Sequence, residues 1–409
     1  IDKAEARGHF YSDKAPGLSF AAAPAYGAVR MAQGFAPPTP ASERLALYLL
    51  TVTVVGATSA AAGARLFVML RRMQISAPAG LAAVFAWGLG TNGFAYATIF
   101  VAHSFVAALV ALALCLLHGV FTRSAATGGG RVAPGTAFAG LLVGWATISE
   151  YPASLVGACI FVYGVWRLGA KAMAWCVVGA ALPLLALGAY NASCFGSPFT
   201  LGYQRLSEPA FRGVIQLGFF GISAPSPTVM AELLFGEFRG ILPLAPWTLL
   251  AVPGFALLLR NESRKAEAVV VGASSLLLFA LASSYARWDG GAALGPRYFV
   301  PALPFLAIPA AVALDAIARL PRVPRAAAGA LAFTAILTSI LICLACVAVM
   351  PELPDVPVPA PLQGMRQPDP KHPITTLVIP LFFRGALSVK ATTPDGRMGF
   401  AMERPGHDH

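Results

Sequence analysis

Residues 319–350, RLPRVPRAAAGALAFTAILTSILICLACVAVM, contain the pattern that decides the fold. Three arginines in 319–325 precede a run at 326–350 that has no charged residue. About 20 apolar residues in a helix are enough to cross the hydrocarbon core of a bilayer. Basic residues beside a span mark its cytoplasmic end. The stretch therefore predicts a transmembrane helix that begins on the cytoplasmic side.

The rest of the chain has the same character. Of its 409 residues, 57% are hydrophobic and 11% are charged, whereas soluble domains are about one quarter charged. A chain of this length with so few charges cannot cover the surface of a water-soluble domain. We therefore predict an all-α fold, a polytopic transmembrane helical bundle of about ten spans. The predicted spans are 44–70, 78–95, 101–121, 133–149, 152–168, 172–193, 241–259, 267–285, 299–318 and 326–350.

The connections between the spans alternate in character. One set is basic and contains a single acid, Glu262, so the positive-inside rule places it in the cytoplasm. The net charge of +11 is spread over these membrane anchors, and nucleic acid is not an expected partner. The other connections are expected to face outward, and they contain acids, bases, aromatic residues and glycines together. The basic connections are Arg71-Arg72, 121–131, 166–171, 260–265 and 319–325.

The spans divide the chain into three parts. Residues 1–43 are expected to form an outer loop with a juxtamembrane helix, at 16–36, that lies on the bilayer surface. Residues 44–350 are the transmembrane bundle. Residues 351–409 are expected to form a Pro-rich linker and a small outward-facing tail. Two patches in that tail are typical of strands, TTLVIPLFF at 375–383 and ALSVKAT at 386–392.

Several polar groups near the apolar runs have structural explanations. Cys343 and Cys346 form a C-x-x-C pattern at lipid depth, which favours buried structural thiols over a redox or metal site. Asp315 and Arg319 are spaced for an i,i+4 ion pair at the end of a span.

The first candidate site is residues 11–17, YSDKAPG, just before the predicted juxtamembrane helix. Lys14 can hold a phosphate as a point charge. Asp13 can orient a base, bind a metal ion or take up a proton, and Tyr11 is a candidate substrate-binding residue. An ordinary turn at the membrane surface is the alternative.

The second candidate site is the glycine-rich connection ARWDGGAALGPRY at 286–298. Glycines let backbone N–H groups approach a ligand, and the guanidinium groups of Arg287 and Arg297 suit bidentate contacts with phosphate. Asp289 and Tyr298 complete the predicted substrate-binding group. The alternative is a flexible loop anchored at the membrane surface by its aromatic residues.

Three further candidates come from other outer connections. Glu150, followed by Tyr151, lies between two spans, where a carboxylate needs a partner. Glu150 is a candidate catalytic residue, Tyr151 a candidate ligand contact, and a structural ion pair with an arginine is the alternative. His103, at the start of a span, is a candidate substrate-binding residue, although a lone histidine is more often structural than a ligand. Arg239 is a candidate substrate-binding residue in the long outer loop 194–240, whose composition suits a lid, a sugar-stacking surface or a packed connector.

The sequence contains no P-loop, no G-x-S-x-G elbow and no H-E-x-x-H. The outer motifs, in their order, resemble the GT-C superfamily of membrane glycosyltransferases, in particular bacterial members related to protein O-mannosyltransferases and to the aminoarabinose transferase of lipid A. DKAPG at 13–17 is similar to the acid-Lys-Pro element of that family, with one extra residue before the proline. The run at 290–306 is similar to a late outer loop and the span after it. The resemblance covers most of residues 9–318.

The resemblance implies an inverting glycosyltransferase that moves a sugar from a polyprenyl-phosphate carrier to an acceptor hydroxyl or similar group. Lys14 would hold the carrier phosphate, and Asp13 and Glu150 are the candidate catalytic residues. The acceptor would be an envelope glycan, lipid or protein. The resemblance also implies the bacterial inner membrane, with the catalytic loops facing outward. No soluble cofactor is required, and a divalent metal ion is left open.

The family places a catalytic acid upstream of the lysine element, after a first span. Only Asp2 and Glu5 precede that element here, so we expect an N-terminally truncated chain whose base lies before Ile1. Two other classes stay open: a secondary transporter or flippase of a lipid-linked or small polar substrate, and a non-catalytic degenerate homologue. Transporters carry polar sites at the middle of the membrane, whereas the span centres here are nearly free of charge.

Overall fold

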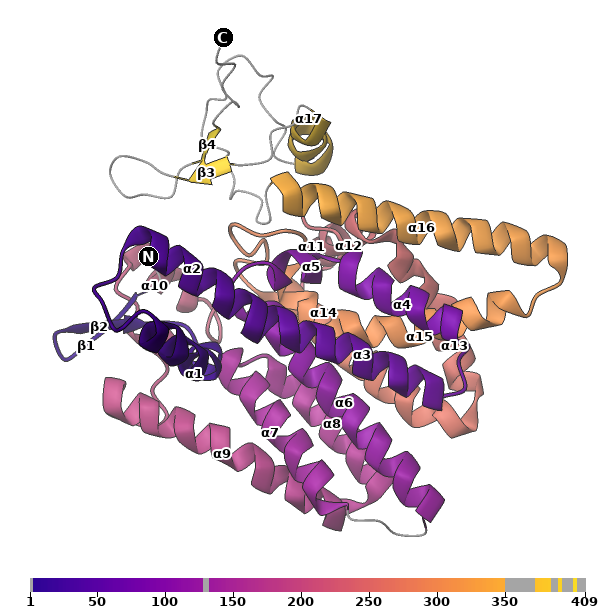
Figure 1. The fold of residues 1–409 in the computed structure, drawn as a ribbon, viewed down its shortest axis with the longest axis horizontal. Helices are drawn as coiled ribbons and strands as arrows, with labels where there is room; N and C mark the ends of the chain where they lie inside the picture. Colours follow the sequence, from indigo (N-terminus) through magenta and orange to yellow (C-terminus); the bar gives the residue numbers. More distant parts are fainter. Residues whose placement is uncertain (1–2, 128–131, 350–371, 384–388, 392–399, 403–409) are drawn as a thin grey trace.

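A computed structural model describes residues 3–127, 132–349, 372–383, 389–391 and 400–402 (Figure 1). The described chain is a bundle of helices, with two small two-stranded antiparallel sheets near its ends. The predicted all-α bundle is therefore confirmed.

Six of the described helices are long and apolar enough to cross a membrane. The first is continuous from α2 through a π-helical segment to α3. The six are α2, η1 and α3 (Pro40–Leu50, Thr51–Gly56 and Ala57–Arg72), α6 (Ala102–Thr127), α9 (Ala170–Phe195), η4 and α14 (Glu262–Arg264 and Lys265–Ser284), η5 and α15 (Arg297–Ala302 and Leu303–Ala318) and α16 (Arg322–Val349).

Four shorter apolar helices occupy the remaining predicted spans. Each has 10–17 residues, so the number of ten spans stays a prediction. One predicted run, 78–95, is interrupted because the Thr91 side chain accepts a hydrogen bond from Gly93 N (3.2 Å) and starts a separate helix, α5 (Asn92–Ala97). Another, 241–259, begins with the short α12 (Ile241–Leu244). The four are α4 (Ala77–Leu89), α7 (Ala133–Ser149), α8 (Ala153–Leu168) and η3 with α13 (Pro246–Leu250 and Ala251–Arg260).

Small residues let neighbouring helices approach closely. A Cβ on Gly140 of α7 would lie 1.9 Å from the carbonyl oxygen of Cys176 on α9. A Cβ on Gly179 of α9 would lie 1.8 Å from the carbonyl oxygen of Ala137. Helix association in lipid depends on such backbone contact, because there is no hydrophobic driving force between helices. The position of α7, and of the residues at its end, is therefore fixed by α9.

The N-terminal segment begins with a hairpin that the sequence does not predict. β1 (Lys3–Ala6) and β2 (His9–Ser12) pair antiparallel. The two turn residues, Arg7 and Gly8, have φ angles of 54° and 75°. Positive φ at both positions is typical of the two-residue type I′ turn, whose twist matches the strands. The isolated bridge between β1 and Leu206 attaches the hairpin to the long outer loop.

Helix α1 (Gly17–Ala32) confirms the helix predicted at 16–36, while its place on the bilayer surface stays a prediction. Its first residue packs against the end of α7. Trp145 Nε1 donates a hydrogen bond to Gly17 O (2.9 Å), and a Cβ on Gly17 would lie 2.3 Å from Ser149 Oγ. The glycine is required by this contact, which holds the 11–17 motif beside the end of α7.

The C-terminal patch at 375–383 is helical, so the strand prediction for it is wrong. The segment forms η6 (Ile374–Val378) and α17 (Ile379–Phe383). The apolar residues Ile374, Val378 and Leu381 are four and three positions apart, and they pack in one cluster with α16. Burial against α16 therefore outweighs the strand propensity of the β-branched residues.

The other predictions near the C-terminus have different outcomes. The patch at 386–392 contains β3 (Val389–Ala391), which pairs with β4 (Phe400–Met402), so its strand is confirmed. The predicted linker, 351–363, lies outside the described residues. Cys343 and Cys346 are buried free thiols in the cluster with α17, which confirms the predicted burial of this pair.

The predicted ion pair at the end of α15 is confirmed. Arg319 Nη2 lies 2.5 Å from Asp315 Oδ2, and Asp315 Oδ1 also accepts a hydrogen bond from Ser76 N (2.9 Å).

Candidate functional site

The chain path brings most of the predicted site residues to one end of the bundle. Helix α6 starts beside His103 and runs to the basic connection at 121–131, and α7 returns to end at Glu150. Helix α8 then leads away from Tyr151 to the basic connection at 166–171. The site end is therefore opposite to the basic end.

Asp13 and Lys14 form an ion pair at this end. Lys14 Nζ lies 3.5 Å from Asp13 Oδ2. The Asp13 side chain is buried, whereas the Lys14 side chain is 51% exposed. Lys14 Nζ also lies 5.7 Å from the centre of the Tyr203 ring, within the range of a cation–π contact. The buried carboxylate of Asp13 therefore holds Lys14 in place, while the lysine side chain lies partly at the surface.

Tyr203 connects the elements of the site, although it was not among the predicted site residues. Its ring lies 6.1 Å from that of Tyr151. Burial raises the pKa of the Tyr203 phenol well above its usual value, and the nearby groups of Asp13, Tyr151, Tyr298 and Glu150 raise it further. The sequence shows Tyr203 only as one aromatic residue in a loop rich in Gly and Pro, which does not single it out.

Glu150 and His103 form a second polar pair. Glu150 caps the end of α7, and its Oε1 contacts His103 Nδ1. The side chains are 18% and 17% exposed. The His103 ring also packs edge-on against Tyr96, with 5.0 Å between ring centres. The ion pair of Glu150 is thus with a histidine, while an arginine, the partner that the structural alternative expects, lies nearby as Arg297.

The phenol of Tyr151, directly after Glu150, is half-buried. Burial, together with the nearby phenol of Tyr190, raises the pKa of Tyr151 to about 12. Tyr151 is therefore neutral at physiological pH and can act as a hydrogen-bond donor.

Arg297 approaches the same centre from the start of η5. Its Nη2 donates a hydrogen bond to Tyr298 Oη (3.1 Å), and its guanidinium lies close enough to Glu150 and Tyr96 for electrostatic interaction. Its Nε is buried and has no hydrogen-bond partner among the described residues. Gly290 (φ 75°) is needed beside it, because a Cβ there would lie 2.9 Å from Arg297 Cδ. The glycine in the loop thus makes room for the arginine.

Arg239 holds the glycine-rich loop from inside. Its side chain is fully buried. The guanidinium donates hydrogen bonds to the carbonyl oxygens of Asp289 (2.7 Å), Gly291 (2.7 Å) and Ala293 (2.8 Å), and to that of its neighbour Phe238 (3.1 Å). Arg239 was predicted to bind substrate, and the structure places it where it positions the loop that carries Arg297.

Arg287 and Asp289 pair with each other at the start of that loop. Arg287 Nε and Nη2 lie 3.0 Å from the two carboxylate oxygens. Burial by itself would raise the pKa of Asp289. The hydrogen bonds and charge of Arg287, the N–H of Gly291 and the charge of Arg239 outweigh burial and lower this pKa below its ordinary value.

The other side of the same loop is fixed by α5. Tyr96 Oη accepts a hydrogen bond from Leu294 N (3.0 Å), and Asn92 Nδ2 donates to Leu294 O (3.0 Å). Both side chains are buried. Neither residue was predicted to belong to the site. In the sequence, an Asn or a Tyr that supports a loop cannot be distinguished from one that packs in the core.

The predicted residues thus fall into three groups. The residues of the first group, the central group, lie close to the rings of Tyr203 and Tyr96. Arg239, Arg287 and Asp289 shape the glycine-rich loop. Tyr11 lies on β2, where its ring packs against Phe195 at 5.7 Å. The central group is Asp13, Lys14, His103, Glu150, Tyr151, Arg297 and Tyr298.

A metal ion has no evident site in the part of the chain that the structure describes. No group of three or more His, Cys, Asp or Glu residues is found there that could hold one. The two acids of the central site each contact a base, Asp13 with Lys14 and Glu150 with His103.

Comparisons with known proteins give distant likenesses. No family model matches the chain, and no curated protein matches it significantly. The chain is similar to the crystal structure of ArnT from Cupriavidus metallidurans in the apo state, with 18% identity over 85% of this chain and 56% of that chain and a TM-score of 0.49. For the same protein bound to undecaprenyl phosphate, the identity is 16% over 84% of this chain and 56% of that chain, with a TM-score of 0.48.

The oligosaccharyltransferase of Archaeoglobus fulgidus in the apo form is a third similar structure. The identity is 14% over 84% of this chain and 47% of that chain, with a TM-score of 0.45. The chain spans about half the length of these proteins, 56% of ArnT and 47% of the oligosaccharyltransferase.

Proposed function

We propose that this chain is a membrane glycosyltransferase, which moves a sugar from a polyprenyl-phosphate carrier to an acceptor hydroxyl or similar group on the outer face. One observation carries the proposal. Lys14 and the carboxylate of Glu150 lie near Tyr203, and a second cation, Arg297, lies near Glu150 and bonds to Tyr298, at one end of an apolar helical bundle. A substrate with a hydrocarbon tail and a charged head fits such a place, since the tail stays in the membrane and the head reaches the charged groups.

Lys14 and Arg297 are proposed to hold the phosphate of the carrier. The phosphate must leave with the bonding electron pair, and cations that meet the developing charge lower the barrier to that step. Two features support these roles. Lys14 presents its ammonium group at the surface, 3.5 Å from the buried Asp13 that locates it. Arg297 has a buried N–H that no described protein group uses.

Glu150 is proposed as the base, with Asp13 as the second catalytic candidate. The acceptor hydroxyl would give its proton to the Glu150 carboxylate as its oxygen bonds to the anomeric carbon. The bond from that carbon to the phosphate oxygen breaks on the opposite side, so the anomeric centre is inverted. His103 Nδ1 contacts the carboxylate and can receive the proton from it.

The rings of Tyr151, Tyr203 and Tyr298 are proposed to line the sugar. Aromatic faces pack against the apolar faces of sugar rings, while phenol hydroxyls bind sugar hydroxyls. The groups assembled here complete the transfer without a soluble cofactor, and a divalent ion stays an option. The basic connections at the opposite end support an outward-facing site. We place the chain in a bacterial inner membrane, as the resemblance in the motifs implies.

A transfer assay tests the proposal. The purified full chain is incubated with polyprenyl-phosphate sugars and envelope acceptors, and the product is detected by mass spectrometry. We expect transfer, with a loss of at least about tenfold in Lys14→Ala, because a charge-assisted hydrogen bond contributes about 1.5–3 kcal/mol. Arg205→Ala, an exposed change in the loop that carries Tyr203, serves as the matched control and should keep full activity.

Three other results would overturn parts of the proposal. Full activity in both Lys14→Ala and Arg297→Ala would remove the assigned phosphate site. Flux of substrate into liposomes without a covalent product would assign the chain to the transporters. Binding of the donor without product or flux would mark a non-catalytic homologue.

A further inference from the structure

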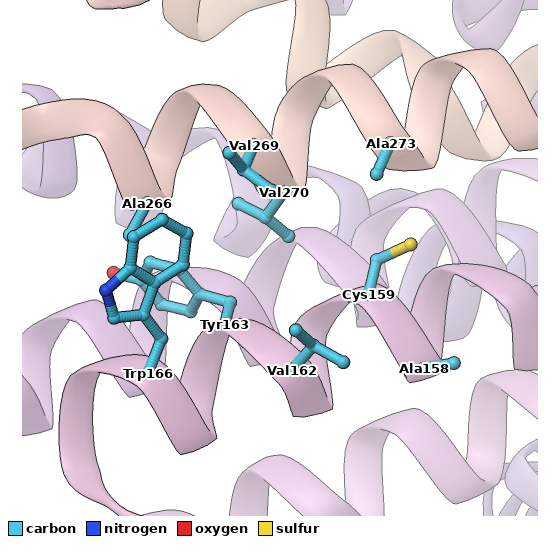
Figure 2. Close-up of a pocket in the computed structure, with 9 residues that line it drawn as sticks. All are labelled: Ala158, Cys159, Val162, Tyr163, Trp166, Ala266, Val269, Val270 and Ala273. Atoms are coloured by element: carbon cyan, nitrogen blue, oxygen red, sulfur yellow. The ribbon is translucent and has the colours of Figure 1, made fainter.

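A cavity lies between α8 and α14 (Figure 2). The cavity has a volume of about 210 Å³, and its walls are alkyl and aromatic apart from the Tyr163 hydroxyl, the Cys159 thiol and the Trp166 indole N–H. Residues 158–166 of α8 border it, which at 1.5 Å per residue is a length of about 12 Å. Its shape and lining suit a hydrocarbon chain rather than a polar solute.

The cavity opens sideways from the bundle. Three of its lining residues are on the outer surface, with Val162 58%, Trp166 54% and Val269 40% exposed. Both helices are predicted spans, so the medium at this opening is the hydrocarbon of the bilayer. A lipid chain can therefore enter laterally without crossing water.

The cavity ends at the basic end of the bundle. Trp166 is in the last turn of α8 and Ala266 in the first turn of α14. The two connections beside them, 166–171 and 260–265, contain five basic residues and one acid. Tryptophan at this depth is typical of the headgroup level of a membrane, and clustered Lys and Arg attract anionic lipid headgroups.

The inner wall of the cavity is held rigid by a buried polar network. Tyr163 Oη donates a hydrogen bond to Glu267 Oε1 (2.8 Å), which lies 3.2 Å from His118 Nδ1. Arg167 Nη2 donates to the other carboxylate oxygen of Glu267. These bonds join α6, α8 and α14, so the cavity is preformed and the hydroxyl of Tyr163 is already in use.

We propose that this cavity binds one acyl chain of an anionic phospholipid, whose phosphate lies beside the connections 166–171 and 260–265. The charge around the opening favours an anionic over a zwitterionic phospholipid. A polyprenyl phosphate would place its phosphate at the other end of the bundle, where Lys14 and Arg297 lie. This site is additional to the proposed transfer site and does not depend on it.

Photo-crosslinking tests the proposal. The full chain is placed in phosphatidylcholine nanodiscs that contain a trace of a phospholipid with a diazirine on one acyl chain, and labelled peptides are mapped by mass spectrometry. We expect a phosphatidylglycerol probe to label 153–168 and 265–284 about fivefold more than a phosphatidylcholine probe, the effect of roughly one well-placed basic residue. Lys265→Gln should reduce that preference.

Filling the cavity should remove the labelling. Val162→Trp fills it from α8 and Ala273→Leu from α14, so that one variant remains if the other fails to fold. The control is Val178→Trp on α9, a position that is 59% exposed and does not line the cavity. Equal labelling by both probes, or unchanged labelling in a folded cavity-filled variant, would overturn the proposal. Competition by undecaprenyl phosphate but not by phosphatidylglycerol would also overturn it.

Discussion

The two ends of the bundle use the same residue types in different arrangements. At the basic end, Glu267 is 1% exposed and is bonded to His118, Tyr163 and Arg167. At the site end, Glu150 is 18% exposed and contacts His103. A buried carboxylate with several fixed partners stabilises a fold, whereas a partly exposed one with a titratable partner can exchange a proton with a ligand.

The arginines differ in the same way. Arg167 is committed to Glu267, to Ser263 O (2.6 Å) and to the face of the Phe121 ring. Both arginines keep a buried Nε without a hydrogen-bond partner among the described residues, but there Arg297 bonds to Tyr298 and makes no ion pair with a carboxylate. Similar composition therefore gives a structural network at one end and a candidate site at the other, and this contrast can be tested.

The largest expected effect is at the basic end. Glu267→Ala should lower the free energy of unfolding by about 3–5 kcal/mol, because it leaves buried partners uncompensated. Thermal unfolding in detergent measures this loss. Glu262→Ala, on the same segment but with its side chain 82% exposed, should change stability by less than about 0.5 kcal/mol. Equal effects of the two substitutions would contradict the contrast.

The next effect is at the site end and concerns rate. Arg297→Ala should reduce the transfer rate about 10²–10³-fold, as expected for the loss of a donor that meets charge in the transition state. Its unfolding temperature should stay close to that of the parent chain. Arg297→Lys should restore part of the rate, because it keeps the positive charge but loses the planar guanidinium group that can form two parallel hydrogen bonds. A large loss of stability without a loss of rate would make Arg297 structural.

A smaller, mixed effect is expected at Arg239. Arg239→Lys cannot satisfy all the carbonyl oxygens that the guanidinium bonds, at a cost of about 1–3 kcal/mol in stability. The transfer rate should fall as well, since the loop that carries Arg297 loses its support. Unfolding and transfer are measured on the same preparation. Loss of donor binding with unchanged stability would instead make Arg239 a direct ligand contact, as the sequence predicts.

The smallest expected effect is a dependence of stability on pH below about pH 4. The pKa of Asp289 is lowered in the folded chain, so its contribution to stability is fully present above the ordinary aspartate pKa of about 4. That contribution is lost as the pH falls through the lowered value. Unfolding temperatures should therefore be insensitive to Asp289 between about pH 5 and 7, and Asp289→Asn should flatten the fall below about pH 4. A fall that begins near neutral pH and disappears in Asp289→Asn would contradict this pairing.

The long helices were predictable because each is an apolar run with a basic connection at one end. The failures have two physical causes. The patch at 375–383 has strand propensity, but its folding is decided by burial against α16. The hairpin at 3–12 depends on a turn, Arg7-Gly8, that is too short to stand out in the sequence. The first case was decided by a tertiary contact, and the second by a local turn whose sequence signal is weak.

The charged residues of the candidate site were predictable from the sequence, whereas the residues that position them were not. Asp13, Lys14, Glu150 and Arg297 lie in loops of unusual composition, so they could be picked out as candidates. The pairing of Glu150 with His103 joins residues from different connections, which no spacing reveals. The role of Glu267 as the centre of a buried network was not predicted. A single acid near the start of an apolar run is typical of the polar residues that flank a span.

Binding of a polyprenyl phosphate tests the central claim most directly. Undecaprenyl phosphate is titrated into the purified chain, and the affinity is compared with that of Lys14→Ala, Arg297→Ala and Arg205→Ala. The account predicts saturable binding that each of the first two substitutions weakens at least about tenfold, while Arg205→Ala binds as the parent does. Equal affinity in the parent, Lys14→Ala and Arg297→Ala would contradict it.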